Sequence, residues 1–151
     1  MNSQTQDFQK TLQIIWNQSI QTFKPPKKLK VSEWADNHRV LTSESSAEAG
    51  QWKTSRAEYQ RGIMDTLNDR DIESIVIMSS AQVGKTEILL NMLGYHIAHD
   101  PAPMLVVMPT LEMARAFSTQ RLSKMISASD ALRGKVKDSK SRDSGNTILS
   151  K

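Results

Sequence analysis

Residues 79–86, Ser-Ser-Ala-Gln-Val-Gly-Lys-Thr, combine residue types and spacing that suit the binding of a phosphate chain. In the pattern G-x-x-x-x-G-K-[ST], backbone N–H groups surround phosphate oxygens, a lysine reaches the β- and γ-phosphates, and a hydroxyl holds Mg²⁺. Gly84, Lys85 and Thr86 satisfy the second half, whereas Ser79 stands where the first glycine is expected. An ordinary strand-to-helix turn is the alternative interpretation.

The pattern predicts a nucleotide site with two sets of residues. Lys85 and Thr86 are the candidate catalytic residues, and Thr86 is also the candidate Mg²⁺ ligand. The nucleotide-binding residues expected from the loop are Ser79, Ser80, Ala81, Gln82, Val83, Gly84, Lys85 and Thr86.

The elements on either side of the loop have the order that such a site needs. Residues 75–78, Ile-Val-Ile-Met, form an apolar run typical of a parallel strand buried on both faces, and residues 87–98 carry apolar side chains at helical spacing. A second apolar run at 104–108 precedes Pro109, Thr110 and another helix, and residues 147–151 look like the start of a third strand. This order predicts an α/β fold with parallel strands.

The amino-terminal residues predict a separate helical arm at 1–23. The linker after it begins with the stiff, basic sequence Lys-Pro-Pro-Lys-Lys, and a short helix with Ser32 as its N-cap follows. We place the linker, short helix and loop at 24–55 and the first part of the phosphate-loop domain at 56–151. The apolar stripe of the arm, which would cover either a partner or this chain's own core, consists of Phe8, Leu12, Ile15, Trp16, Ile20 and Phe23.

Composition excludes several classes of protein. The 151 residues contain no cysteine, which excludes a disulfide-stapled fold, and no apolar run approaches the roughly 20 residues of a membrane span. The start of the chain lacks the apolar core of a signal peptide, so we expect the protein in the cytoplasm of the cell that makes it.

The two ends of the chain are basic. Residues 1–31 hold five lysines against one aspartate, and residues 121–151 hold eight Lys or Arg against three aspartates. Such basic ends either contact nucleic acid or are simply solvated.

Five short motifs in order give the chain a family resemblance. From about residue 31 onward the sequence resembles the amino-terminal part of lambda-type phage large terminase subunits. The motifs are Glu33-Trp34-Ala35, Glu58-Tyr59-Gln60-Arg61, the loop from Ser80 to Thr86, Pro109-Thr110, and Lys-Ser-Arg-Asp-Ser-Gly-Asn-Thr at 140–147.

The resemblance implies a fold, a reaction and partners. The fold would be an incomplete P-loop ATPase core of the helicase-like or RecA-like kind, with parallel strands, behind the amino-terminal helical arm. Proteins of this family use ATP and Mg²⁺ to drive double-stranded DNA through the portal into a prohead, and a carboxy-terminal nuclease domain cuts concatemeric DNA. They act in the host cytoplasm. Their amino terminus contacts the small terminase subunit, which would then bind the helix from Phe8 to Phe23.

The resemblance also implies a role for individual positions. Lys85 would contact the β- and γ-phosphates, and Thr86 would hold Mg²⁺. Gln60 falls at the adenine-reading glutamine with Tyr59 beside it, and an amide can donate and accept at once, as the adenine edge requires. The alternative is an exposed helix glutamine beside a core tyrosine. Thr110 either belongs to a segment that couples the site to DNA or caps the next helix.

Two features depart from the family pattern. Gln82 occupies a loop position where many packaging ATPases carry arginine, so Arg61 and Arg115 become the candidates for a charge-stabilising arginine. After residue 110, no acidic residue follows an apolar strand run, so a Walker B strand and the nuclease carboxylates are not recognised. We therefore expect the front of a longer protein, which binds nucleotide with little turnover.

Two alternative functions stay open at this point. The chain would be part of another helicase-like P-loop ATPase, or a non-enzymatic segment that binds the small subunit. His96 and His99 lack accompanying carboxylates at metal-binding spacing, and we expect them at a helix C-terminus, where the helix dipole favours them.

Overall fold

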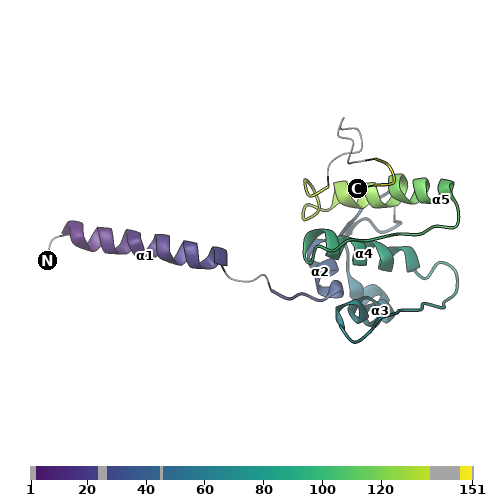
Figure 1. The fold of residues 1–151 in the computed structure, drawn as a ribbon, viewed down its shortest axis with the longest axis horizontal. Coiled ribbons are helices and arrows are strands. Elements are labelled where there is room, and N and C mark those ends of the chain that lie inside the picture. The colour runs from purple at the N-terminus through teal and green to yellow at the C-terminus, as the bar shows by residue number, and fades with distance from the viewer. Residues whose placement is uncertain (1–2, 24–26, 45, 137–146, 151) are drawn as a thin grey trace.

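The computed structural model of the chain describes residues 3–23, 27–44, 46–136 and 147–150, and these residues are mostly helical (Figure 1). The sequence of elements is α1 (Ser3–Phe23), α2 (Val31–His38), β1 (Val40–Leu41), β2 (Gly50–Gln51), the 3₁₀ turn η1 (Thr54–Ala57), α3 (Tyr59–Asp65), the 3₁₀ turn η2 (Thr66–Asn68), α4 (Lys85–Ala98), α5 (Leu111–Ala116), the π-helical η3 (Phe117–Leu122) and α6 (Ser123–Ala128).

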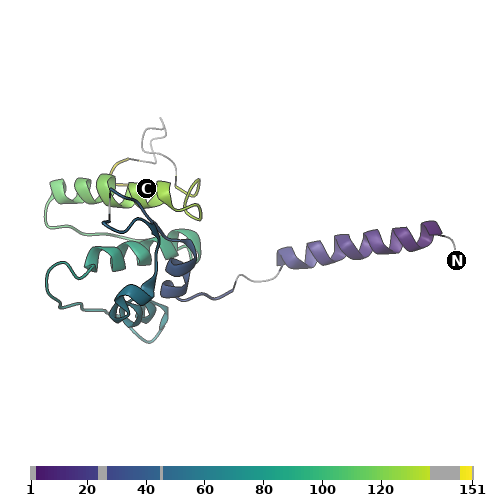
Figure 2. The same cartoon turned by 180° about the vertical axis from the view of Figure 1, so that it is seen from behind.

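Helix α4 occupies the middle of the folded body. The elements α5, η3 and α6 join end to end into one rod on one side of α4, and α2 and α3 lie on its other side (Figures 1 and 2). Helix α4 has apolar residues around most of its circumference, so it can be covered from both sides. The helix predicted for 87–98 is therefore confirmed, and it begins two residues earlier, at Lys85.

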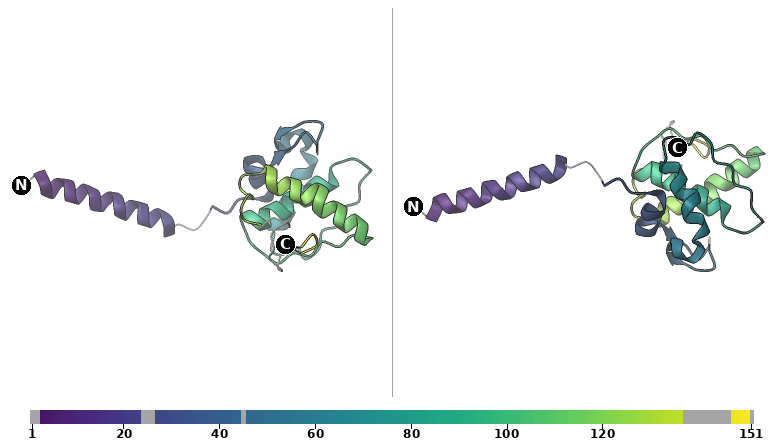
Figure 3. Two further views of the ribbon diagram at one scale, coloured as in Figure 1. Left: turned by 90° about the horizontal axis from the view of Figure 1, so that it is seen from above. Right: turned by 90° about the horizontal axis from the view of Figure 1, so that it is seen from below.

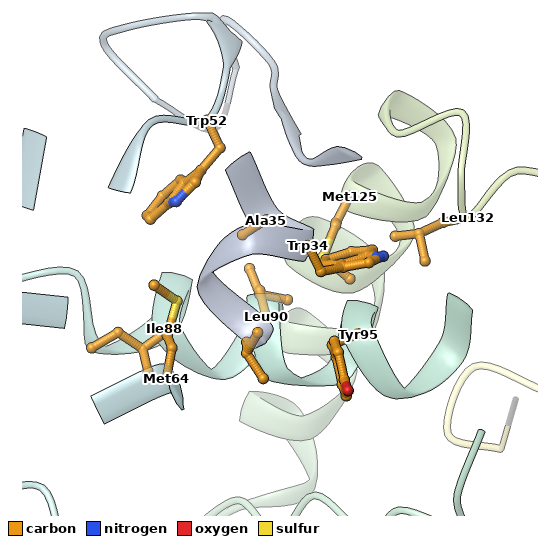
Figure 4. Packing of buried hydrophobic residues seen from close by; sticks show 10 residues of the cluster. Trp34, Ala35, Trp52, Met64, Ile88, Leu90, Tyr95, Met125 and Leu132 are labelled. Atoms are coloured by element: carbon orange, nitrogen blue, oxygen red, sulfur yellow. The ribbon is translucent and has the colours of Figure 1, made fainter. Parts of the chain in front are cut away.

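The core forms where α2, α3, α4 and α6 meet (Figure 4). Trp34 is 1% exposed and its indole lies against Gly94, where an added Cβ would be 2.4 Å from the Trp34 ring. Only a residue without a side chain lets the ring approach the α4 backbone this closely. The other fully or largely buried apolar members are Val31, Ala35, Trp52, Met64, Ile88, Leu90, Leu93, Tyr95, Met125 and Leu132.

The amino terminus of α2 is capped by residues from a distant part of the sequence. The backbone N–H groups of Val31 and Ser32 donate to Asn68 Oδ1 at 2.9 Å and to Asp65 Oδ1 at 3.0 Å. The prediction of Ser32 as N-cap is wrong, because the helix begins at Val31 and the Ser32 hydroxyl is buried inside it. Side chains thirty-odd positions away satisfy the donors that a local cap would otherwise satisfy.

The prediction of two parallel strands is wrong for the described residues. Segments 75–78 and 104–108 are extended, but neither forms a backbone–backbone hydrogen bond with another described residue. The sheet in this part of the chain is an antiparallel pair, with Val40 opposite Gln51 and Leu41 opposite Gly50. A helix satisfies its own backbone, whereas a strand needs hydrogen-bond partners on a neighbouring segment. Apolar side chains alone do not provide that neighbour.

Both extended segments keep the side-chain alternation of a strand. Val76 and Leu105 are 89% and 87% exposed, whereas the adjacent Ile77 is 37% exposed and Val106 is half-buried. Successive side chains of an extended chain point to opposite sides, so one face packs and the other faces solvent. The apolar run therefore predicted the alternation of side chains correctly and their burial on both faces wrongly.

The third strand expected at 147–151 is also wrong for its described residues. Thr147 N donates to Ser150 O at 2.8 Å, which closes a turn, and the Ser118 hydroxyl donates to the backbone oxygen of Ile148. Most of the 140–147 motif and Lys151 lie outside the described residues.

The predicted amino-terminal helix is present as α1, and it projects away from the body in every view (Figure 3). Leu12, Ile15, Trp16 and Ile20 of the predicted stripe are exposed, Trp16 by 67%. The side chains of Phe8 and Phe23 and linker residues 24–26 lie outside the described part. None of the described helices has the length and hydropathy needed to cross a membrane.

Candidate nucleotide site

The loop before α4 has two residues in the left-handed backbone region. Gln82 has φ of 59° and Gly84, the N-cap of α4, has φ of 78°. Such a backbone turns successive N–H groups toward one concavity, and the free N–H groups of the first turn of α4 extend it. A glutamine with positive φ carries strain, which clusters at ligand-binding turns. The backbone form is that of an anion-binding loop at a helix N-terminus.

Lys85 and Thr86 follow this loop in the first turn of α4, where both are exposed. The Lys85 ammonium folds back over the loop and donates to the backbone oxygen of Ser80 at 2.5 Å and to that of Ser79 at 3.4 Å. The lysine thus already covers the hollow of the loop, where backbone oxygens accept its hydrogen bonds. A phosphate group in the same place would offer stronger, charged acceptors.

Tyr59 and Gln60 hold the loop from the side of α3. The Tyr59 hydroxyl and the Gln60 amide nitrogen both donate to the backbone oxygen of Val83, at 3.0 and 3.1 Å. Gln60 is 3% exposed and Tyr59 is 59% exposed, so the alternative of an exposed glutamine beside a core tyrosine is wrong. The structure thus brings this pair to the loop before α4.

The contact between Gln60 and the loop is close enough to constrain residue 84. A Cβ added to Gly84 would lie 2.5 Å from Gln60 Nε2, and its positive φ already disfavours other residues. The Gln60 carbonyl oxygen Oε1 is buried and has no hydrogen-bond partner among the described residues. A buried acceptor left without a donor is uncommon, which makes it a candidate contact for a ligand.

A cavity of about 430 Å³ opens beside the loop. The residues around it come from α3, the extended segment before the loop, and the start of α4, and they include Tyr59, Ile63, Ile77, Val83 and Lys85. Mostly apolar walls with a few polar groups and one cation are typical of small-ligand pockets of this size. The cavity adjoins the predicted phosphate contact, Lys85, and also Tyr59, the neighbour of the predicted base contact.

A buried ion pair that the sequence analysis missed supports the first turn of α4. Arg39, which is 2% exposed, donates from Nη2 to Glu87 Oε2 at 2.8 Å and from Nε to Asn91 Oδ1 at 3.2 Å. Its Nη1 donates to the backbone oxygen of Val40 at 2.8 Å. Burial lowers the pKa of the Arg39 guanidinium, and the Glu87 carboxylate opposes that change. The group stays charged because an arginine pKa lies far above neutral. No motif marks Arg39, since the pairing spans 48 positions.

The two arginines proposed for charge stabilisation have different surroundings. Arg61 pairs with Glu58 on the surface of α3, where Nε lies 2.5 Å from Oε1, and this hydrogen bond lowers the pKa of the Glu58 carboxyl. Arg115 is exposed in α5. The described contacts bring neither guanidinium to the loop.

The remaining candidates lie at helix termini. Thr110 is the N-cap of α5, since its hydroxyl accepts from Met113 N at 3.2 Å. His99 lies at the carboxy-terminal end of α4, where its Nε2 accepts from Leu29 N at 3.2 Å, and His96 Nδ1 lies 2.8 Å from the backbone oxygen of Asp100. Across the described ranges, no cluster of three or more His, Cys, Asp or Glu residues could hold a metal ion.

The site fits Mg²⁺ only as part of a nucleotide complex. Thr86 offers one exposed hydroxyl, and the nearest first-turn carboxylate, Glu87, is bound to Arg39. Mg²⁺ keeps several waters and commonly takes its remaining ligands from substrate phosphates. A single hydroxyl therefore leaves most ligands of such an ion to the phosphates and water.

The left-handed loop, the lysine that folds over it and the helix that follows have the local form of a phosphate-binding loop. Comparison with known sequences gives the family: the chain belongs to the family described as phage terminase large subunit gpA, ATPase domain, which matches residues 46–151. It is 35% identical over 92 residues to the terminase large subunit of Enterobacteria phage P21, and 34% identical over 88 residues to that of Escherichia phage lambda.

These matches cover 61% and 58% of the chain, and they span 14% and 13% of the two phage proteins. No solved structure matches the chain. The predicted family resemblance is confirmed, and the chain is part of a phage terminase large subunit ATPase domain.

Proposed function

We propose that the chain binds ATP with Mg²⁺ at residues 79–86 and is the nucleotide-binding part of a phage DNA-packaging motor. The left-handed backbone at Gln82 and Gly84, directly before the N-terminus of α4, carries the proposal. It points backbone N–H groups and the positive end of the helix dipole at one anion. Membership in the terminase ATPase domain family supports ATP as the source of that anion.

Each residue of the first turn has a distinct part in this proposal. The Lys85 ammonium leaves the backbone oxygens of Ser79 and Ser80 and donates to the β- and γ-phosphates. The Thr86 hydroxyl is a ligand of the Mg²⁺ that accompanies them. Neutralising the phosphate charge is the chemistry that the bound ion supplies.

Removal of the lysine tests the phosphate site. Lys85→Ala should weaken binding of a fluorescent ATP analogue roughly tenfold or more, because it removes a charge-assisted hydrogen bond. Lys135→Ala is the matched control: it removes the same charge near the far end of α4, where Lys135 Nζ donates to the backbone oxygen of Ala98. Absence of saturable binding by the unaltered chain, or equal losses in both variants, would contradict the proposal. We expect little steady phosphate release from the 151-residue chain.

Gln60 has two possible parts in the site, which can be separated. If its Oε1 accepts a hydrogen bond from the exocyclic amine of adenine, Gln60→Ala should weaken the binding of ATP more than that of GTP. Guanine presents an oxygen at that position, which cannot donate to Oε1. If Gln60 acts only by holding the Val83 carbonyl, the affinities for ATP and GTP should fall equally. We propose the adenine contact, and competition of ATP and GTP for the fluorescent analogue measures the difference.

We also propose that the exposed stripe of α1 binds the small terminase subunit, and that the assembled protein acts on double-stranded DNA at the prohead portal in the host cytoplasm. Isolated exposed apolar residues are common, but four on one face of a projecting helix suit a groove on a partner. Trp16→Ser should abolish pull-down by the small subunit, whereas Asn17→Ser on the same helix should not. Equal pull-down of both variants would contradict this part.

A further inference from the structure

We propose that Arg39 is a positioning residue of the nucleotide site: it fixes and neutralises Glu87, so that the first turn of α4 presents Lys85 and Thr86 without an unpaired carboxylate beside the phosphates. This inference rests on the proposed nucleotide site. It concerns a residue outside the loop, held next to that turn only by the tertiary fold.

The geometry of the pair suits a positioning role. Arg39 bonds Glu87 and Asn91, which are four residues apart and thus lie on one face of α4. A rigid planar guanidinium that contacts two successive turns fixes both the rotation of the helix about its axis and its position along that axis. The third bond, to the Val40 oxygen, anchors the guanidinium to β1.

Stability alone is a weak explanation for this pair. Withdrawing a guanidinium from water is costly, and apolar side chains of similar volume often stabilise a core equally well. Glu87 side-chain atoms are 19% exposed while those of Arg39 are 3% exposed, so the carboxylate reaches toward the surface and the arginine holds it from inside. The ion pair therefore accounts better for the position of the Glu87 carboxylate than for the free energy of unfolding.

The charge of Glu87 gives the pair a direct consequence for phosphate binding. A carboxylate in the first turn of a helix competes with any other anion for the same N–H groups and the same positive dipole end. Glu87 directly follows Thr86, so its charge would oppose a triphosphate in the adjacent loop. Because Arg39 offsets this charge, the loop keeps its attraction for anions.

The proposal predicts rescue by a second substitution. Arg39→Met should weaken ATP binding on the order of a hundredfold, since one unit charge about a helix turn away acts across an effective dielectric near 20. Adding Glu87→Gln to Arg39→Met should return the affinity to within roughly threefold of the unaltered chain, because the unpaired charge is gone. A merely structural role also allows such rescue, but it predicts equal losses of ATP and ADP affinity. ADP, with less charge, should lose less affinity than ATP in the Arg39→Met variant.

Two controls separate the possible outcomes. Asn68→Ala removes the contacts to Tyr95 and Val31 near the other end of α4, so it should lower stability without changing ATP affinity. No binding by the unaltered chain overturns the proposed function together with this inference. Binding that is unchanged by Arg39→Met, or loss that Glu87→Gln does not reverse, overturns this inference alone.

A conservative variant covers the case in which Arg39→Met fails to fold. Arg39→Lys keeps the cation but cannot bond Glu87 and Asn91 together. Amide hydrogen exchange measured without nucleotide should then speed up in residues 81–90 and stay unchanged in residues 95–98. Unchanged exchange in 81–90 would overturn the positioning role.

Discussion

The helices around Trp34 and the extended segments 75–78 and 104–108 are both rich in apolar residues, yet only the helices are buried. The backbone N–H and C=O groups of helices α2, α3 and α4 form hydrogen bonds within each helix, and the helices pack side by side. The extended segments have apolar side chains of the same types and no strand beside them among the described residues. The comparison teaches that an apolar run is buried only where its backbone N–H and C=O groups have hydrogen-bond partners.

The largest effect expected from this comparison is at Trp34. Trp34→Ala should lower the free energy of unfolding by about 3–5 kcal/mol, because a buried indole at the centre of the helical core is lost. Urea unfolding followed by circular dichroism measures this change. Leu105→Ala, at an exposed position of an extended segment, is the control and should change stability by less than about 0.5 kcal/mol. Similar losses in both variants would remove the distinction between the two regions.

A smaller effect is expected where α4 meets the Trp34 ring. Gly94→Ala places a Cβ 2.4 Å from the indole, and overpacking of this kind should cost about 1–3 kcal/mol. Gly62→Ala in α3 is the matched control, since nothing lies within 4 Å of its added Cβ. Alanine is the better helix former, so this control should stabilise by roughly 0.5–1 kcal/mol. Stabilisation by Gly94→Ala in the same urea series would disprove the close packing.

Tyr95 makes the stability of the helical core depend on pH. Its hydroxyl donates to the Leu29 oxygen at 3.0 Å and accepts from Asn68, and burial raises the pKa of the phenol. The folded chain favours the protonated phenol. Its contribution is therefore complete below the ordinary tyrosine pKa of about 10 and is lost as the pH rises through the higher folded value.

Tyr95→Phe should cost about 1 kcal/mol at neutral pH, the usual net value of a hydrogen bond. It should also remove part of the stability loss of the unaltered chain at alkaline pH. Urea midpoints at pH 7, 9 and above measure both effects, and a variant that loses stability at alkaline pH as steeply as the unaltered chain would contradict the assignment to Tyr95.

The smallest effect is expected on the outer side of the extended segments. Val76→Thr should change the free energy of unfolding by less than about 0.5 kcal/mol, because Val76 is exposed. Ile77→Thr is the matched control on the other side of the same segment and should cost more, since Ile77 is only 37% exposed and lines the cavity beside the loop. A large loss for Val76→Thr would mean that this face is covered in solution.

The local elements were predictable to different degrees. The helix after the phosphate loop follows from apolar spacing and begins at the lysine of the motif, because 3.6-residue periodicity and the loop glycine are both local signals. The α1 helix follows from the same periodicity. The division of residues 54–68 into η1, α3 and η2 was not visible in the sequence, because packing against α2 and α4 decides where each turn tightens.

The candidate site divides in the same way. Gly84, Lys85 and Thr86 could be found from spacing alone, and the family resemblance pointed to Tyr59 and Gln60. Their contacts with the Val83 oxygen, 24 and 23 positions away, were not predicted by any spacing rule. Arg39 gave no signal at all, since a lone arginine in a sequence does not reveal which carboxylate it meets.

The sequence by itself determined the phosphate-loop motif, the helices with clear periodicity and the family. Those properties depend on residues close together in the chain, whose order is enough to specify them. Only the tertiary structure decided that segments 75–78 and 104–108 pair with no other described segment, that Asp65 and Asn68 cap α2, and that Arg39 supports the first turn of α4. These contacts join residues far apart in sequence, and their partners are chosen by packing and by the need to satisfy buried polar groups.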